Sequence, residues 1–340
     1  MSFKKTVLEV KNLYVRYSTL RGYVKANNDV SFTLHRGETL GIAGESGCGK
    51  TTIGLTILRI LPRNAIVEKG QILLDGQDIL KLSEREMQKI RWKKVSMIFQ
   101  GALNALNPVL KVGDQVAEVL VLHEGMDKRD ALEIVRETFV ELGLDPSFVN
   151  AYPHQLSGGM KQRVVIAMAL ALKPAVVIAD EPTTALDVTI QAQIVDLLKK
   201  LQKRFGLSYI YITHDLAVLA EIADSVAIMY AGYIVEYGDV VSIYTNPIHP
   251  YTKGLIASIP SISAIGKKKL YSIPGAPPDL RFLPPGCPFA DRCPLATDKC
   301  RNELPALQKV NKQLVRCHYA ENLNGVPPDE IWRKVYEKQL

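Results

Sequence analysis

The sequence has no apolar segment long enough to cross a lipid bilayer. Its uncharged apolar runs, such as Val164–Leu172 and Ser225–Val235, fall well short of the roughly 20 residues that a transmembrane helix needs. The N-terminus also lacks the apolar core of a secretory signal, because Lys4 and Lys5 are followed by alternating residues as far as Val10. These absences predict a cytoplasmic chain with no membrane pore of its own.

Sequence runs typical of nucleic-acid binding are absent as well. The net charge is +7, from 42 Lys and Arg against 35 Asp and Glu, but no arginine-rich run and no basic run interleaved with aromatics is present. We therefore expect no nucleic-acid partner.

Cysteine is scarce, and its distribution is uneven. Four of the five cysteines, Cys287, Cys293, Cys300 and Cys317, fall close together near the end of the chain. In a cytoplasmic protein such clustering favours a metal site over disulfides. The spacing C-x5-C-x6-C-x16-C matches neither a zinc ribbon nor a ferredoxin, so geometry alone leaves the metal open.

What remains is a globular composition with alternating elements. The 340 residues are 47% hydrophobic and 23% charged, which suits one large α/β domain with an appendage. Residues 7 to 43 alternate like strands, residues 112 to 172 have helical spacing, and strands alternate with helices from Val176 onward. This order predicts a parallel sheet covered on both faces. Prolines become frequent beyond about residue 250, which predicts a small, loop-rich second unit.

A phosphate-binding motif follows the buried strand that ends at Ala43. Residues 44–51 read GESGCGKT, which fits G-x-x-x-x-G-K-[ST], and a helix is predicted from Lys50 to Leu61, ending at Pro62. The backbone amides of residues 46 to 51 should hold the α- and β-phosphates of a nucleotide, Lys50 the β/γ oxygens, and Thr51 a Mg²⁺ ion. The predicted contacts are Ser46, Gly47, Cys48, Gly49, Lys50, Thr51 and Thr52.

Further polar residues end two later strands. Asp180 and Glu181 follow the apolar run that begins at Val176, and such a strand would not carry two carboxylates without a partner. We expect Asp180 to act on Mg²⁺ and Glu181 to polarise an attacking water. His214 closes another predicted strand of the same sheet.

The run LSGGMKQR, residues 156–163, supplies a serine hydroxyl, two side-chain-free amides and then a helix. A helix N-terminus of this kind is an anion site. Lys50, Asp180 and Glu181 already supply the phosphate chemistry of this chain. We therefore assign Ser157, Gly158 and Gly159 to ATP bound by a neighbouring chain.

Together these motifs resemble those of ATP-binding cassette (ABC) ATPases over residues 7 to 245. The resemblance implies an α/β, P-loop NTPase core of ABC type, with an N-terminal antiparallel β region and an inserted helical subdomain at about residues 101–172. It also implies that Tyr17 stacks on adenine, that Gln100 senses Mg²⁺ and the attacking water, and that His214 contacts the γ-phosphate.

The C-terminal residues resemble the extension on ATPase subunits of oligopeptide and dipeptide importers, through Asn246–Thr252 and Gly275–Cys300. This resemblance favours a [4Fe-4S] cluster on the four clustered cysteines, with structural zinc or free thiols as alternatives. We expect an ABC domain at residues 1–250, a loop-rich metal-binding extension at 251–325 and a tail at 326–340.

The function that the resemblance implies is ATP hydrolysis that drives peptide import. Expected partners are a second, different ATPase subunit, two membrane permease subunits and, through them, an extracytoplasmic peptide-binding protein. The chain would lie on the cytoplasmic face of the plasma membrane. Two alternatives stay open: the same motor with oligosaccharide or nickel as cargo, and a soluble ABC ATPase that acts on nucleic acid or ribosomes.

Overall fold

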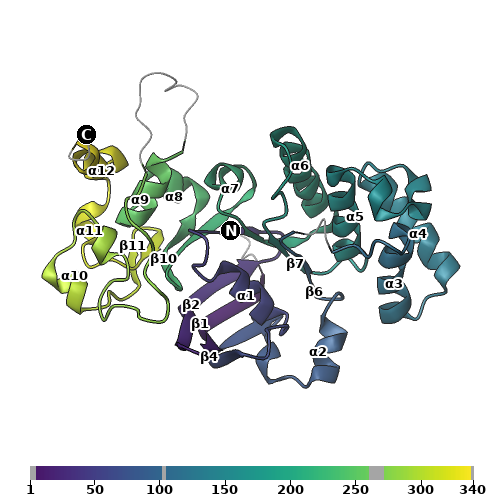
Figure 1. The fold of residues 1–340 in the computed structure, drawn as a ribbon, viewed down its shortest axis with the longest axis horizontal. Coiled ribbons are helices and arrows are strands. Elements are labelled where there is room, and N and C mark those ends of the chain that lie inside the picture. Colours follow the sequence, from purple (N-terminus) through teal and green to yellow (C-terminus); the bar gives the residue numbers. More distant parts are fainter. Residues whose placement is uncertain (1–4, 102–104, 260–271, 338–340) are drawn as a thin grey trace.

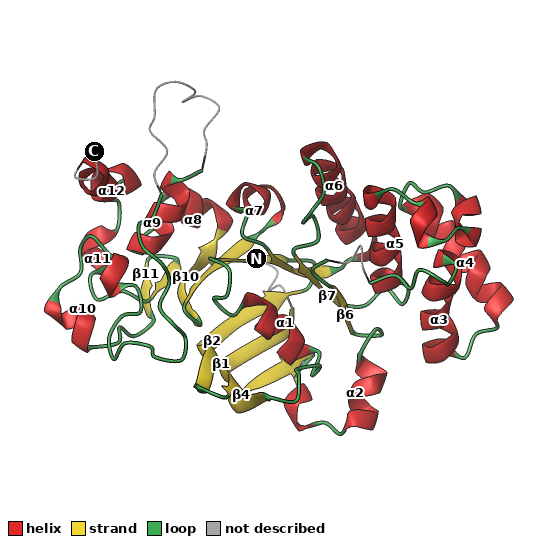
Figure 2. Cartoon of the chain, viewed as in Figure 1, coloured by secondary structure: helices red, strands yellow, loops and turns green. Residues whose placement is uncertain are grey.

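A computed structural model describes residues 5–101, 105–259 and 272–337. Within these residues the strands form two sheets (Figure 1; Figure 2). The main sheet has the strand order β11-β12-β10-β9-β3-β8-β7-β6. Its strands are β3 (Thr39–Ala43), β6 (Val95–Ile98), β7 (Val176–Asp180), β8 (Ser208–Ile212), β9 (Ser225–Tyr230), β10 (Tyr233–Asp239), β11 (Gln308–Val310) and β12 (Gln313–Val315).

Strands β6, β7, β8, β3 and β9 run parallel, as the alternation of strands and helices predicts. Their carboxyl ends therefore meet at one edge of the sheet, where ligands of open α/β sheets bind. The connecting helices include α6 (Val188–Phe205) and α7 (Leu216–Ile222).

The rest of the main sheet is antiparallel, so the sheet is mixed rather than wholly parallel. Ala231 and Gly232 join β9 to β10 in a two-residue hairpin, and both have positive φ values, of 49° and 84°. A turn of this kind returns the chain beside the strand that it has just left. Strand β12 then pairs with β10, through Glu236 opposite Val315.

The N-terminal residues form the second, antiparallel sheet, in the order β2-β1-β4-β5. Its strands are β1 (Thr6–Thr19), β2 (Gly22–His35), β4 (Ala65–Leu74) and β5 (Gln77–Asp78). Helix α1 (Lys50–Ile57) contacts both β2 and β7, so it lies between the two sheets. It ends four residues before the expected Leu61, because Arg59 adopts φ 52° and the N–H of Ile60 turns back to the carbonyl of Leu55.

A helical region lies between β6 and β7 in the chain and at one end of the molecule (Figure 1). It contains α3 (Val112–Glu124), α4 (Lys128–Glu141) and α5 (Gly158–Leu170), while α2 (Glu84–Ile90) precedes β6. Helix α4 buries Ala131, Val135 and Phe139, which recur at the spacing of one helix face.

The C-terminal residues lie at the opposite end of the molecule (Figure 1). Their helices are α8 (Val240–Thr245), α9 (Pro250–Ala257), α10 (Asp298–Asn302), α11 (Ala320–Leu323) and α12 (Pro328–Glu337). Besides the pairing of β12 with β10, the buried Phe289 and Trp332 belong to the same hydrophobic cluster as Tyr230 of β9. The proline-rich region therefore shares a core with the sheet domain.

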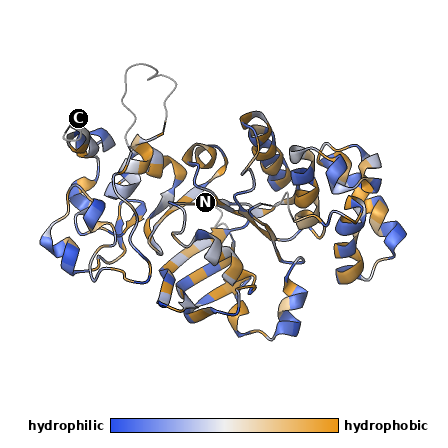
Figure 3. Ribbon diagram, viewed as in Figure 1, coloured by the Kyte–Doolittle hydropathy of each residue, from blue (hydrophilic) through white to orange (hydrophobic). Residues whose placement is uncertain are grey.

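Both faces of the main sheet are covered. Along β7, Val177 and Ala179 pack into the cluster formed with the helices, whereas Val176 and Ile178 pack into the cluster beneath the N-terminal sheet. All four side chains are fully buried. Figure 3 shows the apolar residues gathered at the centre of the molecule, with polar residues along peripheral helices such as α10.

Candidate nucleotide site and cysteine pocket

The loop between β3 and α1 has the strand–loop–helix context that its sequence predicts. Two of its glycines cannot be replaced without a clash. At Gly44, with φ 152°, a Cβ atom would lie 2.2 Å from the carbonyl oxygen of Met229, and at Gly49, with φ 102°, 2.0 Å from that of Ala26. These close approaches hold the loop at the amino end of α1, where helix amides and the helix dipole favour a phosphate.

An open pocket with a cavity volume of about 320 Å³ lies against this loop. It brings together most of the residues predicted to bind a nucleotide, and it contains three residues that sequence reasoning missed. The predicted members are Tyr17, Ser46, Gly47, Gly49, Lys50, Thr51, Thr52, Gln100 and Glu181, and the others are Val24, Ala26 and Leu280.

Lys50 and Tyr17 each have partners within the pocket. The buried Lys50 donates from Nζ to the carbonyls of Gly44, at 2.7 Å, and Glu45, at 3.0 Å. The Tyr17 hydroxyl lies 3.1 Å from that of Thr52 on α1, and Tyr17 pairs across the strands with Val24 of β2, which also lines the pocket. Cys48 does not line the pocket; its buried thiol lies 3.8 Å from Lys50 Nζ, beneath the loop.

Asp180 ends β7 with a buried carboxylate, 1% exposed. Its Oδ1 atom has no hydrogen-bond partner. Burial raises the pKa of Asp180, and a hydrogen bond with Thr51 opposes that effect. A buried carboxylate oxygen that lacks a partner, beside a threonine hydroxyl, is the donor set that Mg²⁺ takes in nucleotide sites.

Glu181 is the point at which three strand ends meet. Its carboxylate accepts hydrogen bonds from Gln100 Nε2 at 3.0 Å and Thr184 Oγ1 at 2.8 Å, and lies 3.0 Å from Nδ1 of His214. Gln100 follows β6 and His214 follows β8, so parallel strand ends bring together residues that are far apart in sequence.

The surroundings of Glu181 keep it ionised. Burial raises the pKa of its carboxyl, but the hydrogen bonds from His214 and Thr184 outweigh burial and hold the pKa below its ordinary value. His214 is 62% exposed and lies outside the pocket lining, so its link to the site is its contact with Glu181.

Ser157, Gly158 and Gly159 do not line the nucleotide pocket. Ser157 is exposed and caps α5, accepting a hydrogen bond from the N–H of Met160 at 3.4 Å. At Gly159 a Cβ atom would lie 2.8 Å from the side chain of Ile190 on α6, so close helix packing requires a glycine there.

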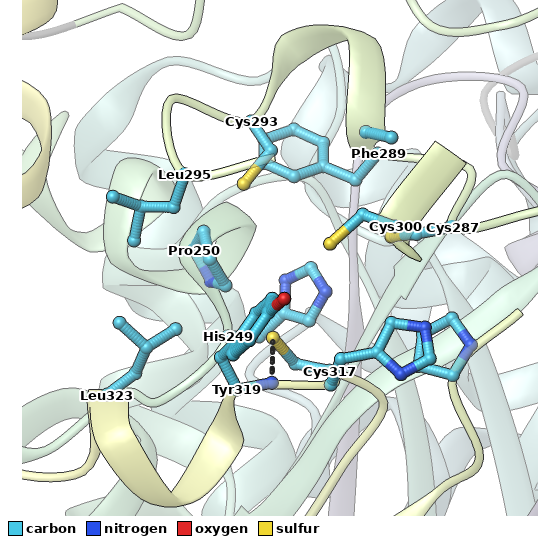
Figure 4. A pocket seen from close by; sticks show the side chains of 13 residues that line it. His249, Pro250, Cys287, Phe289, Cys293, Leu295, Cys300, Cys317, Tyr319 and Leu323 are labelled. Atoms are coloured by element: carbon cyan, nitrogen blue, oxygen red, sulfur yellow. Dashed lines mark hydrogen bonds between the residues drawn. The ribbon is translucent and has the colours of Figure 1, made fainter. Parts of the chain in front are cut away.

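A second, much smaller pocket, with a cavity volume of about 20 Å³, lies in the C-terminal region. Cys287, Cys293, Cys300 and Cys317 all line it, with apolar neighbours that include Phe289. Figure 4 shows the thiol groups of Cys293, Cys300 and Cys317 extending into it. All four cysteines are free.

Burial raises the pKa values of three of these thiols, to about 11 for Cys287 and about 12 for Cys293 and Cys317. In the described part of the chain, no set of three or more His, Cys, Asp or Glu side chains is arranged to hold a metal ion. The expected metal-binding character of this region is therefore not visible as a preformed site.

Comparison with known proteins identifies the family. The ABC transporter family model matches residues 27–184. The oligopeptide transport ATP-binding protein OppD of Bacillus subtilis (strain 168) is 49% identical over 308 residues, covering 90% of this chain and 86% of that protein. The chain belongs to the ABC transporter family of ATPases. The dipeptide transport ATP-binding protein DppD of the same organism is 50% identical, covering 88% of this chain and 90% of that protein.

Solved structures show the same ABC fold. The dimeric cassette MJ0796, described as a bacterial ABC transporter cassette, has a TM-score of 0.62 and 30% identity, covering 68% of this chain and 98% of the cassette. A second MJ0796 structure is titled a dimeric post-hydrolysis state bound to ADP and Pi. The C-terminal region also matches a model named oligopeptide/dipeptide transporter, C-terminal region, at residues 235–300.

Two further observations complete the description of this ABC ATPase. Among the described residues, none of the helices has the length and apolar character needed to cross a membrane.

Of the pocket residues that sequence reasoning missed, Val24 could have been found, because it pairs with Tyr17 across β1 and β2. Leu280 gives no signal in the sequence, since it reaches the pocket only through the path of the C-terminal chain.

Proposed function

We propose that this ABC ATPase powers the import of dipeptides or oligopeptides. The observation that carries the proposal is the presence, in one chain, of a nucleotide site and of the region that matches the oligopeptide/dipeptide transporter model. The names of the relatives from Bacillus subtilis support the same cargo.

In this proposal ATP binds with its phosphates at the amino end of α1. The amides of residues 46 to 51 and the ammonium group of Lys50 balance the phosphate charge. Tyr17 stacks on the adenine base, which the position of its ring in the pocket wall supports. Thr52 assists by holding the Tyr17 hydroxyl.

Thr51, Asp180 and Gln100 are the residues that would hold Mg²⁺. The unpartnered Oδ1 of Asp180 supports this assignment, because a buried carboxylate oxygen needs a donor or a cation. When bound, Mg²⁺ neutralises charge on the phosphate oxygens.

Glu181 is the proposed general base. Its lowered pKa keeps the carboxylate ready to accept a proton from water, and Gln100 and His214 fix its two oxygens. The exposed His214 is free to turn toward a γ-phosphate once the nucleotide is bound.

Ser157, Gly158 and Gly159 are proposed to act on ATP held by a partner ATPase, since Ser157 is exposed and lies outside the nucleotide pocket of this chain. Ser157→Arg should leave nucleotide binding by the isolated chain unchanged and impair hydrolysis in the paired subunit. The measurement is ATP turnover of the assembled complex, in which the paired subunit keeps the lysine of its own phosphate-binding loop. Unchanged turnover would reject the assignment.

The proposed assembly contains this chain, a second and different ATPase, two permease subunits and an extracytoplasmic peptide-binding protein. It places the chain at the cytoplasmic face of the plasma membrane, with residues 1–250 as the ABC domain, about 101–172 as its helical subdomain, 251–325 as the extension and 326–340 as the tail.

Affinity purification from solubilised membranes should recover permease subunits. Peptide-stimulated ATP hydrolysis by the reconstituted complex tests the cargo, and stimulation by nickel or an oligosaccharide instead would contradict it.

We also propose that the four cysteines hold a [4Fe-4S] cluster. In such a cluster each thiolate binds a different iron, so its thiolates lie further apart than around one zinc ion. The presence of all four cysteines in the lining of one pocket supports this proposal. When bound, a cluster would cross-link the loops that carry these cysteines.

The test of the cluster is metal and sulfide analysis of the anaerobically purified chain. About four iron and four sulfide per chain with a broad visible absorption band are expected from the cluster type. A colourless chain that holds one zinc, or no metal at all, would show that the assignment is wrong.

A further inference from the structure

The C-terminal region reaches the phosphate-binding loop through Arg292. This residue ends a short 3-10 helix, Ala290–Arg292, and directly precedes Cys293. Its guanidinium donates to both carboxylate oxygens of Glu45, from Nη1 at 2.7 Å and from Nη2 at 2.9 Å. The Arg292 and Glu45 side chains are 7% and 26% exposed, so this bidentate pair is shielded from solvent far more than an ordinary surface pair.

The Arg292 side chain is itself held firmly. Nε donates to the carbonyl of Pro274 at 2.9 Å, and Nη1 donates to the hydroxyl of Tyr230 at 3.2 Å. The guanidinium also lies over the Tyr230 and Phe289 rings, 5.6 Å and 5.9 Å from their centroids. An arginine fixed at this many points gives Glu45 little freedom to move.

A second link joins the same two regions. The N–H of Glu45 donates to the hydroxyl of Tyr251 at 3.0 Å. The Tyr251 ring packs against Phe289 with centroids 5.3 Å apart, and Phe289 lines the cysteine pocket. Since the carbonyl of Glu45 accepts from Lys50, the side chain, N–H and carbonyl of Glu45 each have a partner.

We propose that Arg292 is a positioning residue for ATP binding, through which the cysteine-containing segment holds the phosphate-binding loop of its own chain. The inference rests on the proposed role of this loop in binding ATP. Glu45 places a negative charge in a loop that must accept phosphates, and Arg292 both balances that charge and fixes the backbone beside Lys50.

The contribution of the C-terminal region to the pocket wall supports this role. Leu280 lines the nucleotide pocket, and its carbonyl accepts from the N–H of Lys25 on β2 at 3.1 Å. The region therefore meets the nucleotide pocket at two places, the loop through Arg292 and the wall through Leu280.

The experiment measures the affinity of the full-length chain for a fluorescent ATP analogue. Arg292→Met should weaken binding about tenfold, the order expected when a charge-assisted hydrogen-bonded pair is lost. Adding Glu45→Gln to Arg292→Met should restore most of the affinity, because the unbalanced carboxylate is then gone. The matched control is Arg301→Met, which removes an arginine of the same segment whose partner is the exposed Asp291 and should leave affinity unchanged.

A variant that leaves the C-terminal region untouched guards against misfolding. Glu45→Asp keeps the charge but shortens the side chain by one methylene, so its carboxylate cannot meet Arg292 in the same way. It should weaken binding several-fold in a chain that still folds, as shown by one cooperative thermal transition.

Four results would overturn the inference. The first is normal affinity for the analogue in both Arg292→Met and Glu45→Asp, and the second is an equal loss of affinity in Arg301→Met. The third is no recovery of affinity in the double variant. The fourth is a loss of affinity that follows the melting temperature across all variants. A wild-type chain that binds the analogue no better than Lys50→Ala would instead contradict the proposed function, and the inference with it.

Discussion

The two pockets of this chain are built in opposite ways. The nucleotide pocket collects charged and polar side chains from the ends of β6 and β7 and from the start of α1, and Gln100 and Glu181 are hydrogen-bonded to each other. The cysteine pocket lies among loops and short helices, and four thiols converge in an otherwise largely apolar lining. The edge of the main sheet positions the side chains of the nucleotide pocket, whereas the path of the proline-rich chain positions those of the cysteine pocket.

Their electrostatics differ accordingly. In the nucleotide pocket the pKa of Glu181 is held below its ordinary value, so its reactive form is already present. In the cysteine pocket burial raises the pKa of Cys293 to about 12, so the thiol stays protonated near neutral pH unless a bound metal displaces the proton. We conclude that the nucleotide site is organised before its ligand arrives, whereas the thiols of the cysteine pocket would become charged only on binding the proposed cluster.

The largest expected effect tests the organised site. Glu181→Gln should lower ATP turnover by about 10²- to 10⁴-fold, as the loss of a general base does. ATP binding should persist, because Lys50 and the loop amides are unchanged. Steady-state turnover of the assembled complex and analogue binding by the chain give the two readouts. Glu137→Gln, on α4 and far from the pocket in sequence, serves as the matched control. Normal turnover in Glu181→Gln would reject the assigned role.

The pH dependence of hydrolysis examines the same carboxylate. The pKa of Glu181 is lowered in the folded chain. Its carboxylate therefore becomes protonated, and loses the stabilisation that its hydrogen bonds give the ionised form, only at a pH below the ordinary pKa range of a glutamate. Thr184→Val removes one of the hydrogen bonds that lower this pKa. The acidic limb of the kcat/KM profile should then move to higher pH; a profile that coincides with that of wild type would count against the cited cause.

Local sequence predicted most of the residues that line the nucleotide pocket, because its motifs fix the local backbone. The loop before Lys50, the carboxylates after β7 and the helix of LSGGMKQR each follow from a strand end or a helix start. The contacts of Glu181 with Gln100 and His214 required a parallel strand order, which the alternation of strands and helices implied.

The C-terminal region could not be predicted in the same way. Its few apolar residues join the core of the sheet domain, and its β12 strand completes the main sheet, but nothing in the local sequence specifies the partner β10. The pairing of Arg292 with Glu45 likewise joins residues separated by 247 positions. Contacts of that kind depend on the whole chain path, which residue spacing does not encode.

The same substitution in the cysteine pocket and beneath the phosphate-binding loop sharpens the contrast between the two regions. Cys300→Ser should destabilise the chain by about 2 to 4 kcal/mol, through a buried hydroxyl and the loss of one ligand of the proposed cluster. Cys48→Ser should cost less than about 1 kcal/mol, because a hydroxyl there can accept from Lys50. Thermal unfolding and iron content of the two variants make the comparison. Equal losses of stability, or full iron in Cys300→Ser, would remove the proposed distinction.

Tyr17→Ala addresses the base-binding end of the nucleotide pocket. It should weaken ATP binding by about 1 to 3 kcal/mol if the ring stacks on adenine. Tyr23→Ala is the control, since Tyr23 lies on the neighbouring strand, is 45% exposed and does not line the pocket. Titration with ATP and with a triphosphate that lacks a base separates stacking from phosphate binding. Equal losses for both ligands would contradict a role in stacking.

The smallest expected effect tests whether the two regions are separable. Leu280 belongs to the C-terminal region but lines the nucleotide pocket, whereas Leu295 of the same region lines the cysteine pocket. Leu280→Ala should weaken ATP binding by about 0.5 to 1 kcal/mol, the value of a partly buried aliphatic contact, and Leu295→Ala should not change it. Calorimetric titration of both full-length variants resolves such a difference. Equal affinities would mean that the Leu280 side chain borders the pocket without contacting ATP.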